Sequence, residues 1–446
     1  MGPQRFEMLV DLYGDERMAQ ILSDGALILS WLRFETALAG AQAQLGIIDP
    51  EHAAAIEEAA RPANIDTARL WEETRNVGYP ILPLVRQIDH ALPERHRGHT
   101  HYGATTQDVM DSGLAVQLNE AAARLDELLA AFGAALVTLA ETHADTVIAG
   151  RTHALQAVPT TFGAKIAVYL GELARHRDRL AAARTRVAAV SLFGAGGTSA
   201  AYGEQAGEIR RRVAESLGLR STDVPWHVAR DSLAEFGTVC AFLSATCARF
   251  AREVVDLSRT EIAEVSEAAG HLRGASSTMP QKANPIESEA VIGMAATAGA
   301  LASALYRTME AGHERAAGEW QAEWQVLPQL IALAAGSLRT SASIAEGLQV
   351  FPDAMRHNLR ADGGLVMAEA YMMRLAPIIG RERAHDLVYL AARRCRESGL
   401  PLAEAVRAEL PPEAAEAIDG ELMPEGYVGR PHGTVAAALA MWRGEN

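Results

Sequence analysis

The sequence predicts an all-α protein with a smaller helical domain on either side of a long central helical bundle. The chain has 446 residues, more than the ~250–300 at which a single hydrophobic core usually stops growing, so several domains are expected. Hydrophobic residues make up 49% of the chain and aromatic residues only 5%, so the apolar content is mainly aliphatic and suits packed helices. Three long intervals without proline, 94–158, 160–224 and 226–279, leave room for long helices, because proline is excluded from helix interiors.

The clearest helix is expected over 113–142. Leu118, Leu125, Phe132 and Leu139 recur there every seven residues, which is the spacing of a bundle seam. Four more helices are expected over 165–190, 232–265, 286–312 and 319–345, the last one interrupted or kinked at Pro328. No alternating, strand-like segment longer than four residues is evident, and the sequence shows no internal repeat. Helices this long need partners along their length, which favours assembly between subunits.

Proline and glycine positions divide the chain into three expected domains. Shorter helices punctuated by Pro80, Pro83 and Pro93 predict an N-terminal helical domain over 1–108. The long-helix bundle follows over 109–345, and shorter helices with frequent breaks predict a C-terminal helical domain over 346–446.

Charge and cysteine content exclude some functions. A net charge of −15 argues against a nucleic-acid partner, and an anionic substrate would need a local cationic pocket. Cys240, Cys247 and Cys395 fit neither a disulfide framework nor a metal site. The sequence shows no signal-peptide pattern and no run of 18 apolar residues, so we expect a cytoplasmic protein without a membrane partner.

Three polar segments precede or interrupt the predicted bundle. In HTHYGATTQD at 99–108, Thr105, Thr106 and Gln107 stand at a helix start, where hydroxyls and free backbone N–H groups suit an anion; alternatively, one threonine simply caps the helix. In GRTHALQAVP at 150–159, His153 is either catalytic or structural. In PWHVARDSLAEF at 225–236, Arg230 either binds an anion or forms a surface ion pair with Asp231.

The fourth segment is the loop GASSTMPQKANP at 274–285. A serine can act as a base only if its alkoxide is stabilised, which Lys282, Asn284 and loop N–H groups could do together. The alternative is a flexible linker, since serine, glycine, asparagine and proline are also linker residues. A lysine between two prolines in an apolar neighbourhood favours the functional interpretation.

Together, GASSTMPQKANP, GATTQDVMDSG and GRTHALQA resemble, in order, the three signature regions of the fumarase/aspartase superfamily. The resemblance implies an all-α, three-domain homotetramer whose active sites are built from three subunits, with no cofactor and no metal. It also implies that Ser276 is the base that removes a proton beside a carboxylate, that Lys282 and Asn284 stabilise the aci-carboxylate, and that His153, paired with Glu289, is a general acid or orients the leaving group. The implied substrate-binding residues are Thr105, Thr106, Gln107, Thr152, Ser277, Met279, Arg230 and Arg315.

The sequence indicates less clearly which branch of the superfamily the chain resembles. NVGYPILPLV at 76–85, PWHVARD at 225–231 and EWQAEW at 319–324 resemble 3-carboxy-cis,cis-muconate cycloisomerases, although Trp320 and Trp324 could simply be packing residues. Bacterial members of that family characteristically carry tryptophan where this chain has His153. Adenylosuccinate lyases keep this histidine but have a second catalytic histidine where this chain has Asn76, and their N-terminal Arg-Tyr-Ser segment is missing here.

From these residues we expect a lyase that eliminates a β-substituent from a substituted succinate, such as an N-substituted aspartate, and releases fumarate. The first alternative is a 3-carboxy-cis,cis-muconate cycloisomerase and the second is an adenylosuccinate lyase. In each case the substrate is a small di- or tricarboxylate. A rival of another class is a non-catalytic protein that keeps the fold, as in eye lenses, but the implied reactive residues Ser276, Lys282, Asn284, His153 and Glu289 are all present.

Overall fold

The computed structural model describes residues 12–445, and these form sixteen α-helices with only four short strands. The expected all-α class is therefore confirmed. The described residues form two compact units: the stretch from residue 12 to Leu129 with His176–Ala245 and Gly293–Arg339, and Ala130–Arg175 with Thr246–Ile292 and the stretch from Thr340 to residue 445. The division into three domains stays a prediction, and its first eleven residues lie outside the described part of the chain.

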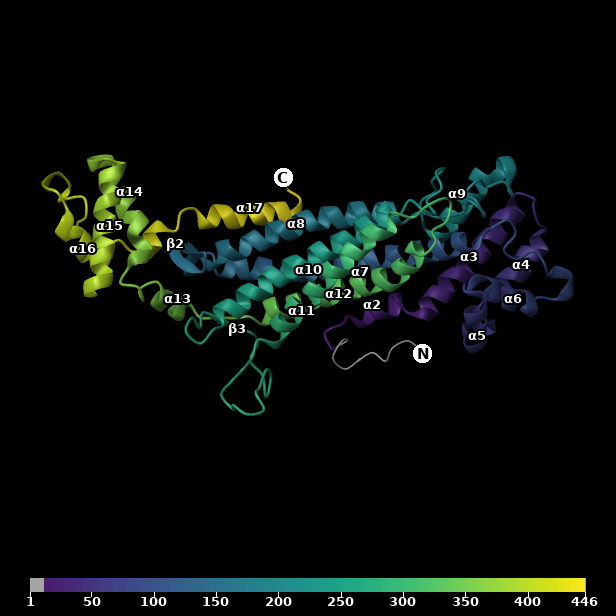
Figure 1. Ribbon diagram of the computed structural model, residues 1–446, viewed down its shortest axis with the longest axis horizontal. Coiled ribbons are helices and arrows are strands. Elements are labelled where there is room, and N and C mark those ends of the chain that lie inside the picture. Colours follow the sequence, from purple (N-terminus) through teal and green to yellow (C-terminus); the bar gives the residue numbers. More distant parts are fainter. Residues whose placement is uncertain (1–11, 446) are drawn as a thin grey trace. The chain divides into compact units, whose positions relative to one another are not determined.

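Five long helices carry residues of both units (Figure 1). They are α7 (Thr106–Thr142), α8 (Phe162–Val187), α10 (Asp231–Leu257), α11 (Ile286–Thr308) and α12 (Glu319–Gly347). The seam predicted on α7 is buried, with Leu118, Leu125 and Phe132 fully inaccessible and Leu139 8% exposed. Pro328 lies within α12 and does not end it. The helix expected over 232–265 is shorter than expected, because α10 ends at Leu257 and Val265 already belongs to a strand.

The long helices pack against each other within each unit. In the first unit Gly237 of α10 faces the side chains of Leu305 on α11 and Leu330 on α12. In the second unit the ring of Phe250 on α10 contacts Phe132 on α7 and Tyr169 on α8, with centroid separations of 5.4 and 5.6 Å. Cys240 and Cys247 lie in this apolar interior, and burial raises the pKa of each thiol to about 12.

Shorter helices complete each unit. In the first unit, Phe34, Leu38 and Ile56 are among the residues of one buried cluster. The short helices that contribute to it are α3 (Asp24–Gln44), α4 (Pro50–Ala59), α5 (Thr67–Val77), α6 (Ile81–Ala91) and α9 (Ala206–Leu217), and α2 (Glu16–Ile21) contacts α3. In the second unit, Tyr371 and Leu375 belong to another such cluster, built from α14 (Ala368–Ile379), α15 (Arg381–Ser398) and α16 (Leu402–Glu409). In the same unit α13 (Pro352–Asn358) contacts β1, and α17 (Pro431–Arg443) lies against α7 and α8.

The expectation that the chain lacks strands longer than four residues is wrong. The antiparallel strands β1 (Val147–Thr152) and β2 (Leu155–Thr161) have six and seven residues. Pro159, opposite Ala149, hides β2 in the sequence, because proline normally argues against a strand. A second, minor pair joins β3 (Val265–Ser266) to β4 (Gln349–Val350).

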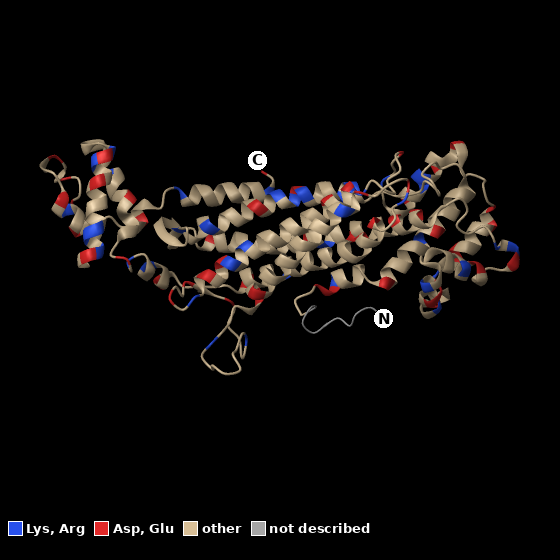
Figure 2. Ribbon diagram, in the orientation of Figure 1, with Lys and Arg blue, Asp and Glu red and all other residues tan. Residues whose placement is uncertain are grey.

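Two helices, α10 and α11, are long and apolar enough to cross a membrane by length and composition alone. The most apolar stretch of α10 is 67% buried, as in the core of a globular protein. That of α11 is only 28% buried, so one chain leaves much of this helix uncovered. Acidic and basic residues are interspersed along the helices, for example on α15 (Figure 2).

Candidate active site

The amino end of α7 carries the first group of expected site residues. Thr105 and Thr106, both partly buried, stand at the helix start, and Gln107 is fully buried in its first turn. Nε2 of Gln107 donates to the carbonyl oxygen of His227 at 2.7 Å and to Oδ2 of Asp111 at 3.1 Å. These bonds leave the amide oxygen of Gln107 free to accept a hydrogen bond.

Arg315 donates three hydrogen bonds at this helix start. Its Nε donates to Oε1 of Gln107 at 3.0 Å, Nη1 to Oγ1 of Thr105 at 3.4 Å, and Nη2 to the carbonyl oxygen of Ala195 at 3.2 Å. Three of the expected substrate-binding residues are thus in contact although 208 or more positions separate Arg315 from the other two. We call Thr105, Gln107, Arg315 and the Ala195 carbonyl the Arg315 cluster. A guanidinium beside a hydroxyl is well suited to hold a carboxylate, and the Gln107 amide oxygen orients the guanidinium.

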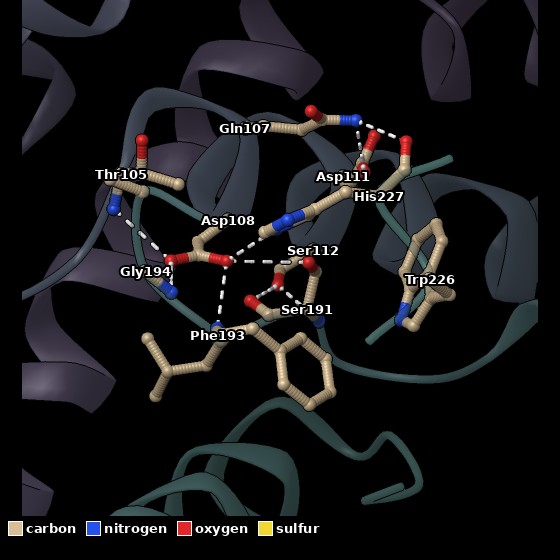
Figure 3. Close-up of polar contacts among 12 residues, drawn as sticks. Thr105, Gln107, Asp108, Asp111, Ser112, Ser191, Phe193, Gly194, Trp226 and His227 are labelled. Carbon is tan, nitrogen blue, oxygen red and sulfur yellow. Dashed lines mark hydrogen bonds and ion pairs between the residues drawn. The ribbon is translucent and has the colours of Figure 1, made fainter. Parts of the chain in front are cut away.

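Asp108, the last residue of the 99–108 segment, has a fully buried carboxylate that joins three segments (Figure 3). It accepts from the backbone N–H groups of Thr105 at 3.1 Å and of Phe193 and Gly194 at 2.9 Å each. It also accepts from Oγ of Ser191 at 3.4 Å and contacts Nε2 of His227 at 2.8 Å. The sequence signal was Asp108 itself, two residues after Thr106, but all its partners except Thr105 lie more than 80 positions away.

Arg230 does not pair with Asp231 at the surface, so that expectation is wrong. Its side chain is 2% exposed and lies between Asp111, at 2.8 and 3.0 Å, and Glu323, at 2.5 and 2.9 Å. Burial acts to lower the pKa of Arg230, but the two carboxylates more than offset it and raise that pKa above its usual value. Its donors are therefore engaged, and it reaches the Arg315 cluster through Asp111, which also accepts from Gln107.

The second group of expected residues lies in the other compact unit, beginning with the tip of the β1–β2 hairpin. Thr152 pairs with Leu155, so His153 and Ala154 form a two-residue turn, and their φ values are 51° and 67°. Such a turn favours glycine or asparagine, because a side chain in the left-handed region is strained by ~1–2 kcal/mol. Thr152 and His153 are exposed, so this strained turn presents the histidine at the hairpin tip.

The hairpin is held, next to its turn, by a buried ion pair that the sequence did not reveal. Nη1 and Nη2 of Arg151 donate to the two oxygens of Glu264 at 2.8 and 2.7 Å, and Glu264 is fully buried. Nδ2 of Asn358 donates to the same carboxylate at 2.9 Å, and Nε2 of Gln156 donates to the carbonyl of Asn358 at 3.0 Å. The hairpin is therefore anchored just below the residue expected to act as acid.

Residues 274–285, which we call the serine loop, form part of the open segment between β3 and α11 (Figure 1). Oγ of Ser276 accepts from the backbone N–H groups of Thr278 at 3.2 Å and of Met279 at 3.0 Å. Two N–H donors at this oxygen are what a serine alkoxide requires. Between positions 268 and 285 the chain carries Arg273 and Lys282 and no acidic residue, so the segment is cationic in an acidic protein (Figure 2).

Asn284 closes the base of the serine loop. Its backbone N–H and its Nδ2 both donate to the carbonyl of Gly274, at 2.8 and 3.0 Å. Gly274 has φ of 65°, and a Cβ there would lie 2.4 Å from the Asn284 carbonyl oxygen, so the position requires glycine.

The remaining expected residues of this unit are Ser277, Met279, Lys282 and Glu289, and all four are exposed. Among the described residues, no hydrogen bond or ion pair joins His153 to Glu289, or Lys282 to Ser276. One chain therefore presents these side chains without bringing them into contact.

Glu267 is a further residue that sequence reasoning missed. It accepts from the backbone N–H groups of Glu287 at 3.2 Å and Ser288 at 2.7 Å, and from the Ser288 hydroxyl at 2.7 Å. A carboxylate that accepts from the first N–H groups of a helix stabilises that end. Glu267 thus fixes the start of α11 directly after the serine loop.

The tryptophans of EWQAEW lie in an aromatic cluster of the first unit. The ring of Tyr79 stacks on Trp320 at 5.8 Å and meets Trp324 edge-on at 6.1 Å, and Nε2 of Gln321 donates to the Tyr79 hydroxyl at 3.1 Å. Trp320 is 4% exposed, which agrees with a packing role. Among residues 12–445, no group of three or more histidine, cysteine or acidic side chains is arranged to hold a metal ion.

Two family models match the chain. The one described as "Lyase" matches residues 5–298, and the one described as "Adenylosuccinate lyase C-terminus" matches residues 364–437. Together they span most of the sequence.

Individual relatives match over nearly the full length. The 3-carboxy-cis,cis-muconate cycloisomerase of Pseudomonas aeruginosa is 42% identical, with 95% of this chain and 94% of the relative covered. The crystal structure of the 3-carboxy-cis,cis-muconate lactonizing enzyme from Pseudomonas putida is 37% identical, with a TM-score of 0.91 and coverage of 98% and 99%. The nitrosuccinate lyase of Streptomyces davaonensis is 36% identical, with 94% and 91% covered.

Proposed function

Because the chain belongs to the fumarase/aspartase superfamily of lyases and is an enzyme of that superfamily, we propose that it acts as a 3-carboxy-cis,cis-muconate cycloisomerase. The observation that carries this proposal is the 42% identity to such an enzyme across 95% of the chain. Sequence analysis placed the fumarate-releasing elimination first and the cycloisomerase second. The relatives favour the reverse order.

The proposed reaction is an isomerisation that keeps all atoms. One carboxylate oxygen of the substrate adds to a carbon of a conjugated double bond, and the electron pair moves onto a neighbouring carboxylate to give an aci-carboxylate. The carbon beside that carboxylate then takes a proton from Oγ of Ser276, which leaves a serine alkoxide that regains a proton from solvent before the next turnover. The N–H groups of Thr278 and Met279, which already donate to this oxygen, support the assignment because they would stabilise the alkoxide.

In this proposal the other site residues bind the negatively charged carboxylates of the substrate. The Arg315 cluster holds one substrate carboxylate, assisted by Thr106 at the same helix start. Lys282 and Asn284 stabilise the aci-carboxylate, while Thr152, Ser277 and Met279 complete the substrate contacts. Arg230 acts indirectly, since its partner Asp111 also fixes the amide of Gln107.

His153 favours a second candidate, a β-elimination from a substituted succinate. In the reverse of cycloisomerisation the departing group is a carboxylate, which leaves without a proton because its pKa is about 4. An amine must be protonated as it leaves, and a histidine beside Glu289 could supply that proton. The resemblance to nitrosuccinate lyase shows that relatives of this chain also act on substituted succinates.

We further propose that the cytoplasmic enzyme is a homotetramer in which the two groups of site residues meet across subunits. Two observations support this assembly. Most of the apolar stretch of α11 is uncovered in one chain. The two groups of site residues belong to different compact units of one chain, and His153 makes no hydrogen bond or ion pair with Glu289 among the described residues.

A substrate panel tests the reaction. Purified enzyme is incubated with 3-carboxy-cis,cis-muconate, N-substituted aspartates and nitrosuccinate, and lactone and fumarate are followed by NMR. Lactone formation from the muconate alone supports the cycloisomerase. Fumarate release without muconate turnover overturns it in favour of the elimination. Turnover of none of these substrates contradicts both candidates.

A further inference from the structure

Every hydrogen-bond partner of Arg315 in the Arg315 cluster is tied to Asp108. Thr105, which accepts from Nη1 of Arg315, donates its backbone N–H to Asp108. Ala195, which accepts from Nη2, follows Gly194, whose N–H donates to Asp108. Gln107 precedes Asp108 in the chain, and its amide is held by the carbonyl of His227, whose ring contacts Asp108.

The buried ring of His227 also contacts Asp108. It is 3% exposed, and its Nε2 lies 2.8 Å from Oδ1 of Asp108 (Figure 3). Nδ1 of His227 has no partner among the described residues. A proton on Nε2 gives the carboxylate a donor, whereas a proton on Nδ1 would be buried without an acceptor, so the geometry favours the Nε2–H form.

We propose that Asp108 and His227 are a positioning pair, which sets the spacing between the guanidinium of Arg315 and the Thr105 hydroxyl that bind the same substrate carboxylate, while the Gln107 amide oxygen orients that guanidinium. The inference rests on the proposed role of the Arg315 cluster in carboxylate binding. Neither residue touches the substrate. Asp108 fixes the helix start and the 191–195 segment, and His227 fixes the amide of Gln107 through its own carbonyl.

The chemistry of the pair explains why a charged carboxylate stands behind an anion site. All the groups around Asp108 are N–H or O–H donors, and an ionised carboxylate accepts from each. An asparagine in its place would direct an NH2 group at some of these donors. The helix start and the 191–195 segment would then move apart or shift. A displacement of about 1 Å is enough to weaken a positioned contact strongly.

The test compares matched variants of the assembled enzyme. His227→Gln keeps an N–H donor near the position of Nε2, and His227→Leu removes that donor. Ser112→Ala is the control, because Oγ of Ser112 donates to the Ser191 carbonyl at 2.8 Å and so anchors the same segment away from Arg315. Steady-state kinetics on the substrate found in the panel, thermal midpoints, and calorimetric titration with tricarballylate are measured for each variant.

We expect His227→Leu and Asp108→Asn to raise KM and weaken tricarballylate binding at least about tenfold, with kcat reduced less than about threefold, because they disturb ground-state carboxylate binding. His227→Gln should stay within about threefold of the wild type in every parameter, and Ser112→Ala should lower only the thermal midpoint. The inference is overturned if His227→Leu binds tricarballylate as the wild type does, or if Ser112→Ala weakens it equally. If Asp108→Asn does not fold, the comparison of His227→Leu with His227→Gln still tests the positioning role.

The two proposals fail in different ways. If the wild type turns over none of the panel substrates, the reaction is misassigned, and tricarballylate titration still tests the positioning pair. If the wild type does not bind tricarballylate at all, the Arg315 cluster is not a carboxylate site and the positioning role falls with it.

Discussion

Arg151 and Glu264 form a two-point ion pair, with N–O distances of 2.7 and 2.8 Å, directly below the turn that presents His153. Glu264 is fully buried and the Arg151 side chain is only 16% exposed. Because 113 residues separate the two, the pair holds the hairpin to the segment between α10 and β3. This ion pair therefore restricts the position of His153.

The first prediction concerns this anchor. Glu264→Ala leaves Arg151 largely buried without its partner, and we expect a loss of about 3 kcal/mol in the free energy of unfolding, measured by urea denaturation. Arg356→Ala, which removes the exposed Arg356–Asp353 pair, is the control and should change the same quantity by less than about 0.5 kcal/mol. Equal effects in the two variants would show that the Arg151–Glu264 pair is no anchor.

The second prediction concerns the strained turn. Ala154 has φ of 67°, so Ala154→Gly should raise the free energy of unfolding by about 1 kcal/mol. Ala149→Gly, in the regular part of β1 opposite Pro159, should lower it by at least about 0.5 kcal/mol. A destabilising effect of Ala154→Gly in urea denaturation would contradict the strain assigned to this turn.

The third prediction concerns pH. Burial acts to lower the pKa of His101, but the Glu35 carboxylate at 2.7 Å more than offsets burial and raises that pKa. The stabilisation is therefore fully present below the ordinary histidine pKa of about 6.5 and is lost as pH rises through the raised value.

His101→Asn tests this linkage, since asparagine tolerates the φ of 63° at this position. The stability difference between wild type and His101→Asn, from urea denaturation, should be larger at pH 6 than at pH 9. The exposed His385→Asn variant should show no such difference. A gap that widens with rising pH would contradict the sign.

The fourth prediction concerns assembly. Ser276→Ala and Arg315→Ala each remove a residue from a different group of the proposed site, and each should lower kcat/KM at least about 100-fold. When the two variants are co-expressed and mixed tetramers are purified, activity should exceed either variant alone by at least about tenfold, because some sites then combine intact groups from different subunits. No recovery in verified mixed tetramers would contradict shared sites.

The sequence was a good guide where one local pattern decided the outcome. The seven-residue seam located α7, and the serine loop followed from its unusual polar residues. The β1–β2 hairpin was missed because Pro159 and the polar residues near its tip hide a strand pattern. Long-range partners could not be inferred: Asp111 and Glu323 lie 119 and 93 positions from Arg230, and only the folded chain shows that they occupy its guanidinium.

The central claim is that Ser276 exchanges a proton with the carbon beside a substrate carboxylate during cycloisomerisation. The most direct measurement is proton NMR of the lactone formed from 3-carboxy-cis,cis-muconate in D2O by the wild type and by Ser276→Ala. We expect one deuterium at that carbon, on a single face, and a rate at least about 100-fold lower in the variant. A lactone formed at an unchanged rate by Ser276→Ala, with the same deuterium at the same face, would contradict the claim.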